Sequence, residues 1–131
     1  TTDINSASDL DQNSIVIFLT YGQYSFLLTS DIGSQTESLL IHDRLIKNAD
    51  ILKIPHHGSG TSSSNLFLKA VDSSVAVISV GANNQFGHPD KDVLARIAES
   101  GTKIIYRTDL NGTITFVMDI NSPTIWVKSE R

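Results

Sequence analysis

The sequence predicts an α/β fold, in which helices pack on a mixed sheet. After an opening β-hairpin, strand-like and helix-like patterns alternate three times along the chain, which is typical of layered α/β proteins. Hydrophobic residues make up 40% of the 131 residues and charged residues 18%, so the chain can bury a core. We expect residues 14–131 to form one domain unit. Residues 1–13 are polar and without periodicity, and we interpret them as a flexible start or a linker remnant.

The first half of the chain predicts a hairpin, a helix and a buried strand. Two β-rich runs flank the sequence Tyr-Gly-Gln, where we expect the turn. A Ser-x-x-Glu spacing then indicates a capping box, in which each side chain accepts a hydrogen bond from the backbone N–H of the other residue. The segments are residues 14–20 and 24–29 for the hairpin, Ser34 and Glu37 for the capping box, Leu39, Leu40, Leu45 and Ile46 for the helix, and residues 51–55 for the strand.

The second half predicts two more helices and several strands. A continuous apolar run over residues 75–80 is typical of a strand covered on both faces. The dipeptide Asn111-Gly112 between two β-rich runs favours a hairpin. One helix is expected at residues 66–71, capped from residues 62–64. The next has Pro89 in its first turn, Gly101 at its end and an apolar face of Val93, Leu94, Ile97 and Ala98. The remaining strands are residues 103–107 and 113–118 of the hairpin and a last strand at residues 124–128.

Polar clusters follow each of the expected parallel strands. Because a strand–helix–strand crossover returns the chain in the same direction, the carboxyl ends of successive strands share one edge of the sheet. We therefore expect these clusters to meet at that edge and to form a functional site. They are Asp31, then His56 and His57, then Asn83, Asn84 and His88, and finally Thr108 and Asp109.

The histidine pair has two interpretations. His56 and His57 end a buried strand and are followed at once by Gly58. Histidine is the commonest metal ligand, but a pair of loop histidines bonded to the backbone is also common. Gly58, Ser59 and Thr61 add a second feature, because such a turn can form a backbone nest that binds a phosphate through its N–H groups.

The other candidate residues each have a structural alternative. Asp31 can bridge two metal ions or serve as a turn residue. His88 can donate to a leaving group, bind a phosphate or cap a helix, and Asn84 can contact substrate or belong to a turn. Asp109 can orient a site histidine through its carboxylate or shape the Asn-Gly turn. His42 lies among charged residues of the first helix, and we interpret it as solvent-facing.

Charge and cysteine content limit the classes of function. The net charge is −4 and no basic patch stands out, which argues against a DNA-binding module that works by counterion release. An enzyme that meets phosphates through bound metal is not excluded, because the ions supply the positive charge. Without cysteine, any metal site must use histidine and carboxylate ligands. No apolar run is long enough to cross a membrane, so we expect no membrane contact from this chain itself.

Four segments in order carry a resemblance to a known family: LLTSD, DILKIPHHGSGTSS, AVISVGANNQFGHP and YRTDLNGTITF. Together they resemble the metallo-β-lactamase-type domain of ComEC-family competence proteins, which are bacterial DNA-uptake proteins. The likeness runs over residues 13–116, and HHGS, GHP and TD-x-x-G in this order are specific to it. Soluble hydrolases of the same superfamily, including secreted phosphodiesterases, share the HHG element.

The resemblance implies an αβ/βα sandwich with one or two metal ions, zinc or manganese, and a nuclease-like activity that cuts a phosphodiester of DNA. It also implies a parent protein in the bacterial inner membrane that carries this domain on the extracytoplasmic side. Asp31 matches the bridging aspartate, and His56 or its neighbour His57 matches a ligand histidine. We accordingly expect Asp31 and His56 to bind metal, His57 and His88 to act in catalysis, Gly58, Ser59, Thr61 and Asn84 to lie near phosphate or substrate, and Asp109 to support a site histidine.

The chain departs from the superfamily pattern in one respect. The superfamily's principal ligands lie in an H-x-H-x-D-H motif, which is absent here. We therefore expect this chain to be the C-terminal half of the domain, as a truncated chain or a proteolytic product, that alone binds metal weakly or not at all and hydrolyses nothing.

The expected partners follow from this interpretation. They are the missing N-terminal half, DNA in the parent protein and, in isolation, a second copy that contacts residues 15–19 and 75–80. Two alternatives stay open. One is a non-catalytic DNA-handling or protein-docking module that kept the fold, and the other is a soluble hydrolase of the superfamily with another substrate.

Overall fold

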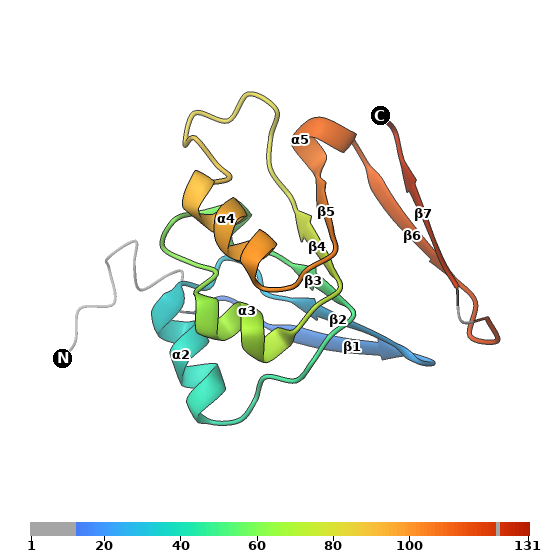
Figure 1. Ribbon diagram of the computed structural model, residues 1–131, viewed down its shortest axis with the longest axis horizontal. Coiled ribbons are helices and arrows are strands. Elements are labelled where there is room, and N and C mark those ends of the chain that lie inside the picture. Colours follow the sequence, from blue (N-terminus) through green and yellow to red (C-terminus); the bar gives the residue numbers. More distant parts are fainter. Residues whose placement is uncertain (1–12, 123) are drawn as a thin grey trace.

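Five strands form the main sheet in the order β1-β2-β3-β4-β5 (Figure 1). β1 and β2 pair antiparallel and β2 to β5 run parallel, so the prediction of an α/β fold with a mixed sheet is confirmed. The computed structural model describes residues 13–122 and 124–131, and the flexible start expected over residues 1–13 lies outside them except for Asn13. The strands are β1 (Ile17–Tyr21), β2 (Tyr24–Leu28), β3 (Ile51–Lys53), β4 (Val75–Ile78) and β5 (Ile104–Arg107), with β6 (Ile114–Met118) and β7 (Ile125–Ser129) in a separate two-stranded sheet.

Three helices connect the parallel strands and pack on one face of the main sheet (Figure 1). Leu27, Leu52 and Ala76 form one row across β2, β3 and β4 and are at most 2% exposed. They lie in the hydrophobic core with Phe67 and Ile97 from the helices, and this core fixes the strand ends relative to one another. The helices are α2 (Ser34–His42), α3 (Asn65–Val71) and α4 (Lys91–Glu99), and shorter turns form η1 (Pro55–Gly58) and α5 (Thr108–Asn111).

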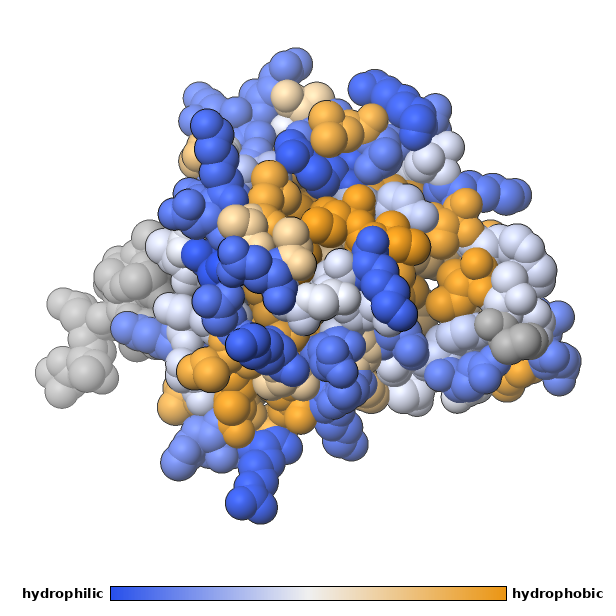
Figure 2. Space-filling view, viewed as in Figure 1, coloured by the Kyte–Doolittle hydropathy of each residue, from blue (hydrophilic) through white to orange (hydrophobic). Residues whose placement is uncertain are grey.

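The opposite face of the main sheet is covered only in part, by the β6–β7 hairpin. The ring of Phe116 contacts Phe26 and Tyr106 edge to face, at centroid distances of 6.3 and 6.2 Å. The Tyr24 hydroxyl donates to the carbonyl of Ser122 in the loop between β6 and β7. An open apolar groove of about 770 Å³ remains between the hairpin and β1–β2. Figure 2 shows hydrophobic side chains gathered between the hairpin and the main body.

The first helix ends earlier than the apolar spacing predicts. α2 stops at His42, which is exposed as expected, so Leu45 and Ile46 lie outside the helix. Arg44 has a left-handed φ of 57°, its N–H donates to the carbonyl of Ile41, and the N–H of Leu45 bonds five residues back. These are the bonds of a Schellman motif, in which arginine takes the position that glycine usually occupies. The sequence therefore gave no glycine signal for this helix end.

The capping box expected at Ser34 and Glu37 does not form. α2 has no side-chain cap, and the N–H of Ser34 donates to the carbonyl of Thr61 at 3.0 Å. Glu37 is instead fully buried, and its carboxylate accepts hydrogen bonds from the N–H groups of Ser63 and Ser64. The carboxylate thus serves the loop before α3 and not its own helix.

Arg96 of α4 holds the same loop from its carbonyl side. Its guanidinium donates to the carbonyl of Ser63 at 2.9 Å and to that of Ser62 at 3.0 Å. We call residues 59–64 the serine loop, and the pair of side chains the Glu37–Arg96 clamp. The clamp ties α2 and α4 to the chain that enters α3, whose N-terminus is capped by the side chain of Ser64 as predicted.

The hairpin expected around Asn111 and Gly112 is wrong, because its two strands belong to different sheets. β5 pairs with β4, and β6 pairs with β7. Between them, the Asn111 side chain accepts a hydrogen bond from the N–H of Arg107 at 2.9 Å and stabilises α5. The Thr108 hydroxyl bonds to the N–H and carbonyl groups of Val80, which holds α5 against the end of β4. The Asn-Gly pair therefore ends a helical turn.

Two smaller expectations also need correction. β4 ends at Ile78, two residues before the apolar run ends, and its side chains alternate between buried and half-buried. It is covered completely only on the helix side, because the β6–β7 hairpin leaves the other face partly open. Pro89 precedes Asp90, the N-cap of α4, and so lies outside the helix, whereas Gly101 follows its end with a φ of 97° as expected.

β1 is an edge strand with exposed apolar side chains. Ile17, Leu19 and Tyr21 are 45–49% exposed, and β1 pairs only with β2 within the described residues. Residues 75–80, also expected at a contact between copies, include β4, which lies between β3 and β5 with Ala76 and Ile78 in the core, and their part in such a contact stays a prediction. We propose that a second copy covers β1 in a solution of the purified chain, because identical edge strands can pair about a two-fold axis.

In the parts of the chain that the structure describes, no helix is long and apolar enough to cross a membrane.

Replacing Leu19 by Glu should shift this equilibrium toward monomer, because a carboxylate on the apolar edge resists burial. Light scattering at micromolar concentration should report a dimer for the unaltered chain and a monomer for Leu19→Glu. Leu66→Glu is the matched control, since Leu66 is 74% exposed but lies on α3, away from β1. A monomeric mass for the unaltered chain would contradict the proposal.

Candidate functional site

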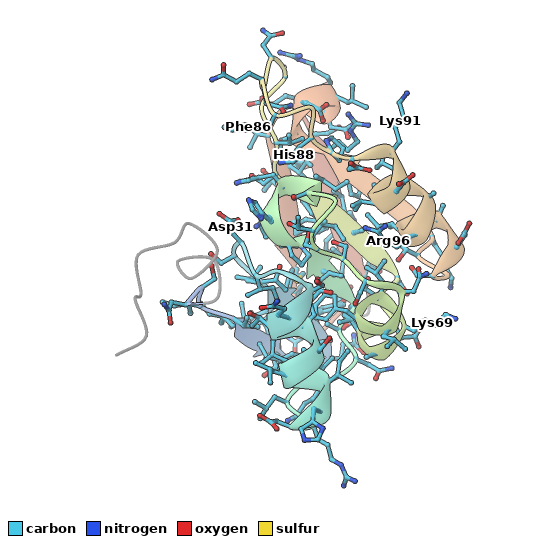
Figure 3. The ribbon with its side chains drawn as sticks, turned by 90° about the vertical axis from the view of Figure 1, so that its left-hand side faces the viewer. Asp31, Lys69, Phe86, His88, Lys91 and Arg96 are labelled. Atoms are coloured by element: carbon cyan, nitrogen blue, oxygen red, sulfur yellow. The ribbon has the colours of Figure 1, made fainter. Side chains whose placement is uncertain are left out.

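The expected residues meet at the carboxyl edge of the parallel strands. Asp31 follows β2, the histidine pair follows β3 in η1, and His88 lies in the loop between β4 and α4. Figure 3 shows Asp31, His88 and Phe86 along one side of the molecule, whereas Lys91 and Arg96 lie on the other. Ring centroids of His56 are 6.3 Å from those of His57 and 6.0 Å from those of His88. The predicted convergence of the polar clusters is therefore present for these four residues.

Asp31 has two cationic or potentially cationic neighbours. Its Oδ1 atom lies 3.7 Å from Nε2 of His57 and 3.7 Å from Nζ of Lys53. Lys53 also donates to the carbonyl of Ser30 at 2.7 Å. Burial is the largest influence on Lys53 and lowers its pKa, while the nearby Asp31 carboxylate acts in the opposite direction. Of the two adjacent histidines, His57 is thus the one within ion-pair distance of Asp31.

The orientation of His57 is fixed by a backbone carbonyl. Its Nδ1 atom lies 2.6 Å from the carbonyl oxygen of Ser79, at the end of β4. A carbonyl only accepts, so Nδ1 carries the proton in this bond. In the neutral ring, the lone pair is then on Nε2, which faces Asp31.

The backbone at the histidine pair is held in an unusual conformation. His56 and His57 have φ values of 47° and 55°, in the left-handed region, which costs a non-glycine residue about 1 kcal/mol or more. Gly58 continues the turn with a φ of 81°. A Cβ atom at Gly58 would lie 2.6 Å from Cβ of Pro89, and the carbonyl of Gly58 accepts from the N–H of Asp90 at 2.8 Å. Glycine is required here so that the two loops of the site can touch.

Asn84 braces the loop that carries His88. Its Oδ1 atom accepts from the N–H of His88 at 2.9 Å, and its Nδ2 atom donates to the carbonyls of His88 and Gly81 at 2.8 and 3.0 Å. The side-chain amide is therefore engaged within the loop, and its geometry favours a structural role over substrate contact.

The pKa of His88 is lowered by burial first and then by the nearby rings of His56 and His57, which favours its neutral form.

Several N–H groups of the serine loop are bonded within the turn. The N–H of Ser59 donates to the carbonyl of His56, that of Thr61 to the Ser59 hydroxyl, and that of Ser62 to the carbonyl of Ser59. The Ser59 and Thr61 hydroxyls also lie 3.0 Å apart. The N–H groups of Ser59 and Thr61 are therefore already bonded within the turn, and phosphate binding by Gly58, Ser59 and Thr61 stays a prediction.

Asp109 is paired with Arg107. The guanidinium Nε lies 3.0 Å from Oδ1 and the terminal nitrogen 2.6 Å from Oδ2, a bidentate ion pair. Both side chains are at most 24% exposed. The ring of His57 is oriented by the Ser79 carbonyl and not by Asp109. That Asp109 orients another site histidine stays a prediction.

Three contributors to the site were missed from the sequence. Lys53 could have been found from register, because parallel pairing places it beside Leu28, three residues before Asp31. Phe86 could have been found because it is an aromatic residue within a polar loop, directly before Gly87 and His88. The Ser79 carbonyl had none, since any residue at that position presents a carbonyl.

The described residues contain no group of three or more histidine, aspartate or glutamate side chains placed to hold one metal ion. Asp31 and His57 come nearest as a pair. Zinc sites in enzymes have three protein ligands, so this pair matches part of such a site.

The fold and the edge cluster define an α/β domain with its polar site at the carboxyl ends of parallel strands. No family model matches the chain. It is 33% identical over 106 residues to ComE operon protein 3 of Bacillus subtilis, 37% over 112 residues to competence protein ComA of Neisseria gonorrhoeae, and 36% over 87 residues to recombination protein 2 of Haemophilus influenzae. The chain belongs to the ComEC family of competence proteins, as the resemblance predicted.

The chain corresponds to a small part of these relatives. The matches cover 81%, 82% and 66% of the chain, but only 14%, 16% and 11% of the respective relatives. The relation thus concerns a short segment of each relative, and the fold is compatible with an αβ/βα sandwich.

Gly58→Ala should lower the free energy of unfolding by about 1–3 kcal/mol, because the methyl group meets Pro89 and the backbone has a positive φ. Gly87→Ala separates the two causes, since Gly87 has a φ of 74° but nothing within 4 Å of the added Cβ. We expect its loss to be smaller, about 1 kcal/mol. Urea denaturation checks both variants, and equal losses would show that contact with Pro89 contributes nothing.

Asp109→Asn should destabilise the chain at neutral pH by about 1 kcal/mol, because it breaks the pair with Arg107. Hydrogen bonds from Arg107 lower the pKa of Asp109 below its ordinary 3.8. The stabilisation is therefore fully present above pH 3.8 and is lost as the pH falls through the depressed pKa. Urea denaturation at neutral and acidic pH should show the difference between variant and unaltered chain shrinking in acid. Asp43→Asn, at an exposed position, is the control, and a pH-independent difference would argue against the ion pair.

Proposed function

We propose that this chain contributes part of the active site of a metal-dependent phosphodiesterase that acts on DNA in a competence protein. Membership of the ComEC family supports the setting of DNA uptake, since relatives are named for competence and recombination. The observation that carries the chemistry is the 3.7 Å separation between Oδ1 of Asp31 and Nε2 of His57. A carboxylate and an imidazole so placed are the ligand types that a cysteine-free zinc or manganese site requires.

The spacing of this pair fits two ligands of one metal ion. Zinc bonds to nitrogen and oxygen are about 2.0–2.2 Å, so two tetrahedral ligands lie about 3.3 Å apart. The Ser79 carbonyl directs the lone pair of His57 toward Asp31. We therefore favour His57 over His56 as the ligand, and we propose that the N-terminal half of the parent domain supplies the remaining ligands.

The chain's own groups have separable roles in this proposal. A bound divalent ion supplies positive charge beside the phosphate and lowers the pKa of water. Lys53 adds a positive charge next to Asp31 and holds the Ser30 carbonyl. His88, whose neutral form is favoured, can accept a proton or donate an N–H bond to a phosphate oxygen. The ring of His56 meets those of both His57 and His88 edge to face.

We extend the proposal to the parent's location by the same family relation. The parent is a membrane-associated competence protein, and we propose the inner membrane with this domain on the extracytoplasmic side.

In the full-length parent, Asp31→Asn and His57→Ala should each lower the rate of metal-dependent cleavage of a DNA oligonucleotide by about 100-fold or more, because each removes a ligand. Removing metal with a chelator should do the same, and zinc or manganese should restore activity. His56→Ala tests the assignment of the ligand and should leave metal affinity closer to normal than His57→Ala.

His42→Ala is the matched control, since His42 is exposed at the end of α2, outside the site. Cleavage that survives both Asp31→Asn and His57→Ala would end the proposal. DNA binding without turnover in the unaltered parent would instead support a non-catalytic DNA-handling module. Turnover of a different phosphodiester or ester would point to another hydrolase of the superfamily.

A further inference from the structure

Phe86 is a highly exposed aromatic side chain beside the site. It is 76% exposed, more than any other large hydrophobic side chain in the described residues. Its ring lies nearly parallel to that of His88, with an interplanar angle of 17° and a centroid distance of 6.0 Å. One side of the ring thus faces His88, and its high exposure leaves the other side open to solvent.

The loop that presents Phe86 is held in place. Asn84 makes three hydrogen bonds within it, and Gly58 contacts Pro89 at its end. A fixed loop spends little conformational entropy when a ligand binds to an exposed side chain on it. Figure 3 shows Phe86 on the same side of the molecule as Asp31.

Phe86 also lines a small hollow that reaches the site. The hollow has a volume of about 190 Å³ and is bounded by His57, His88, Asn84, Val80 and Gly81 besides Phe86. Pockets for drug-sized ligands have volumes of about 300–1,000 Å³, so this one suits a smaller group. Its lining combines the rings of Phe86, His88 and His57 with smaller side chains.

We propose that Phe86 is a stacking platform for an unpaired nucleobase, which makes single-stranded DNA the substrate of the site. The hollow that joins Phe86 to His57 then gives the sugar and phosphate of the same nucleotide a path toward His57 and Asp31. Stacking on an aromatic ring tolerates every base, because each has a π-face, but it requires that the base be free of its pairing partner. This inference rests on the proposed function for the position of the reacting phosphate, whereas the stacking contact itself does not.

The test measures DNA binding by the full-length parent without cleavage. Fluorescence anisotropy with a labelled oligothymidylate, in the presence of a chelator, should show that Phe86→Ala weakens binding about tenfold. Phe86→Trp should keep the affinity, because indole stacks at least as well. An abasic oligonucleotide of the same length should bind the unaltered protein and Phe86→Ala equally, since it has no base to stack.

Leu66→Ala is the control for loss of an exposed apolar side chain, because Leu66 is 74% exposed on α3. Three results would overturn the inference: no binding of oligothymidylate by the unaltered protein, equal binding by Phe86→Ala, or an equal loss on the abasic strand. Failure of the proposed function looks different. In that case the Phe86-dependent, base-dependent binding remains, but no cleavage depends on Asp31 and His57. Conversely, cleavage that needs Asp31 and His57 but has the same KM for single strands in Phe86→Ala would leave the function standing and refute the platform.

Discussion

The buried carboxylate of Glu37 is the interaction on which the geometry of the site depends. It is fully buried and accepts two backbone N–H groups of the serine loop, while Arg96 donates to two carbonyls of the same loop. A buried carboxylate without donors is strongly unfavourable, and so are buried N–H groups without an acceptor, so each partner requires the other. The loop follows η1 directly, and the clamp therefore anchors one end of the turn that carries His56 and His57. Three helices meet at this point, and the hydrophobic core beneath them fixes where the clamp can sit.

The strained turn at the histidine pair shows what this anchoring makes possible. Two consecutive non-glycine residues in the left-handed region would relax in an isolated peptide. Here the turn is over-determined, because the N–H of His56 donates to the carbonyl of Ser30, His57 is bonded to Ser79, and Gly58 touches the loop before α4. The segments after β2, β3 and β4 are thus joined to one another at a single turn. Backbone strain retained in this way is typical of functional sites, where it aims side chains that an ordinary turn would direct elsewhere.

The order of strands and helices was predictable from the sequence, whereas the partners of individual hydrogen bonds were not. Alternation of strands and helices gave the parallel sheet and its carboxyl edge, because crossover topology follows from local pattern alone. The errors arose where a side chain had a choice of partners. Glu37 has the spacing of a capping box but bonds to a loop 26 residues away in sequence. Asn111 precedes Gly112, a pair typical of hairpin turns, but its side chain stabilises α5. The end of α2 was missed because arginine, not glycine, adopts the left-handed conformation there. At the site, the types of the functional residues and the sheet edge on which they lie were predictable from the sequence. Which histidine lies near Asp31 was not, because the conformation of the turn decides that it is His57 and not His56.

The charge of the chain constrains how such a site can meet DNA. The net charge is −4, and three of the ten basic residues, Lys69, Lys91 and Arg96, lie on the opposite side of the molecule from Asp31 and Phe86 (Figure 3). Lys53 is the cation beside Asp31, and burial works against its charge. Affinity from counterion release would therefore be small at this edge, because few phosphates can be neutralised by side chains. Two sources of affinity remain: positive charge from a metal shared with other parts of the parent, and base stacking, which does not depend on charge neutralisation. An acidic domain with an exposed aromatic beside its histidines is consistent with both, and the two act at different atoms of a nucleotide, the phosphate and the base. A site of this kind selects for unpaired strands through geometry, while its overall charge disfavours non-specific retention of duplex DNA.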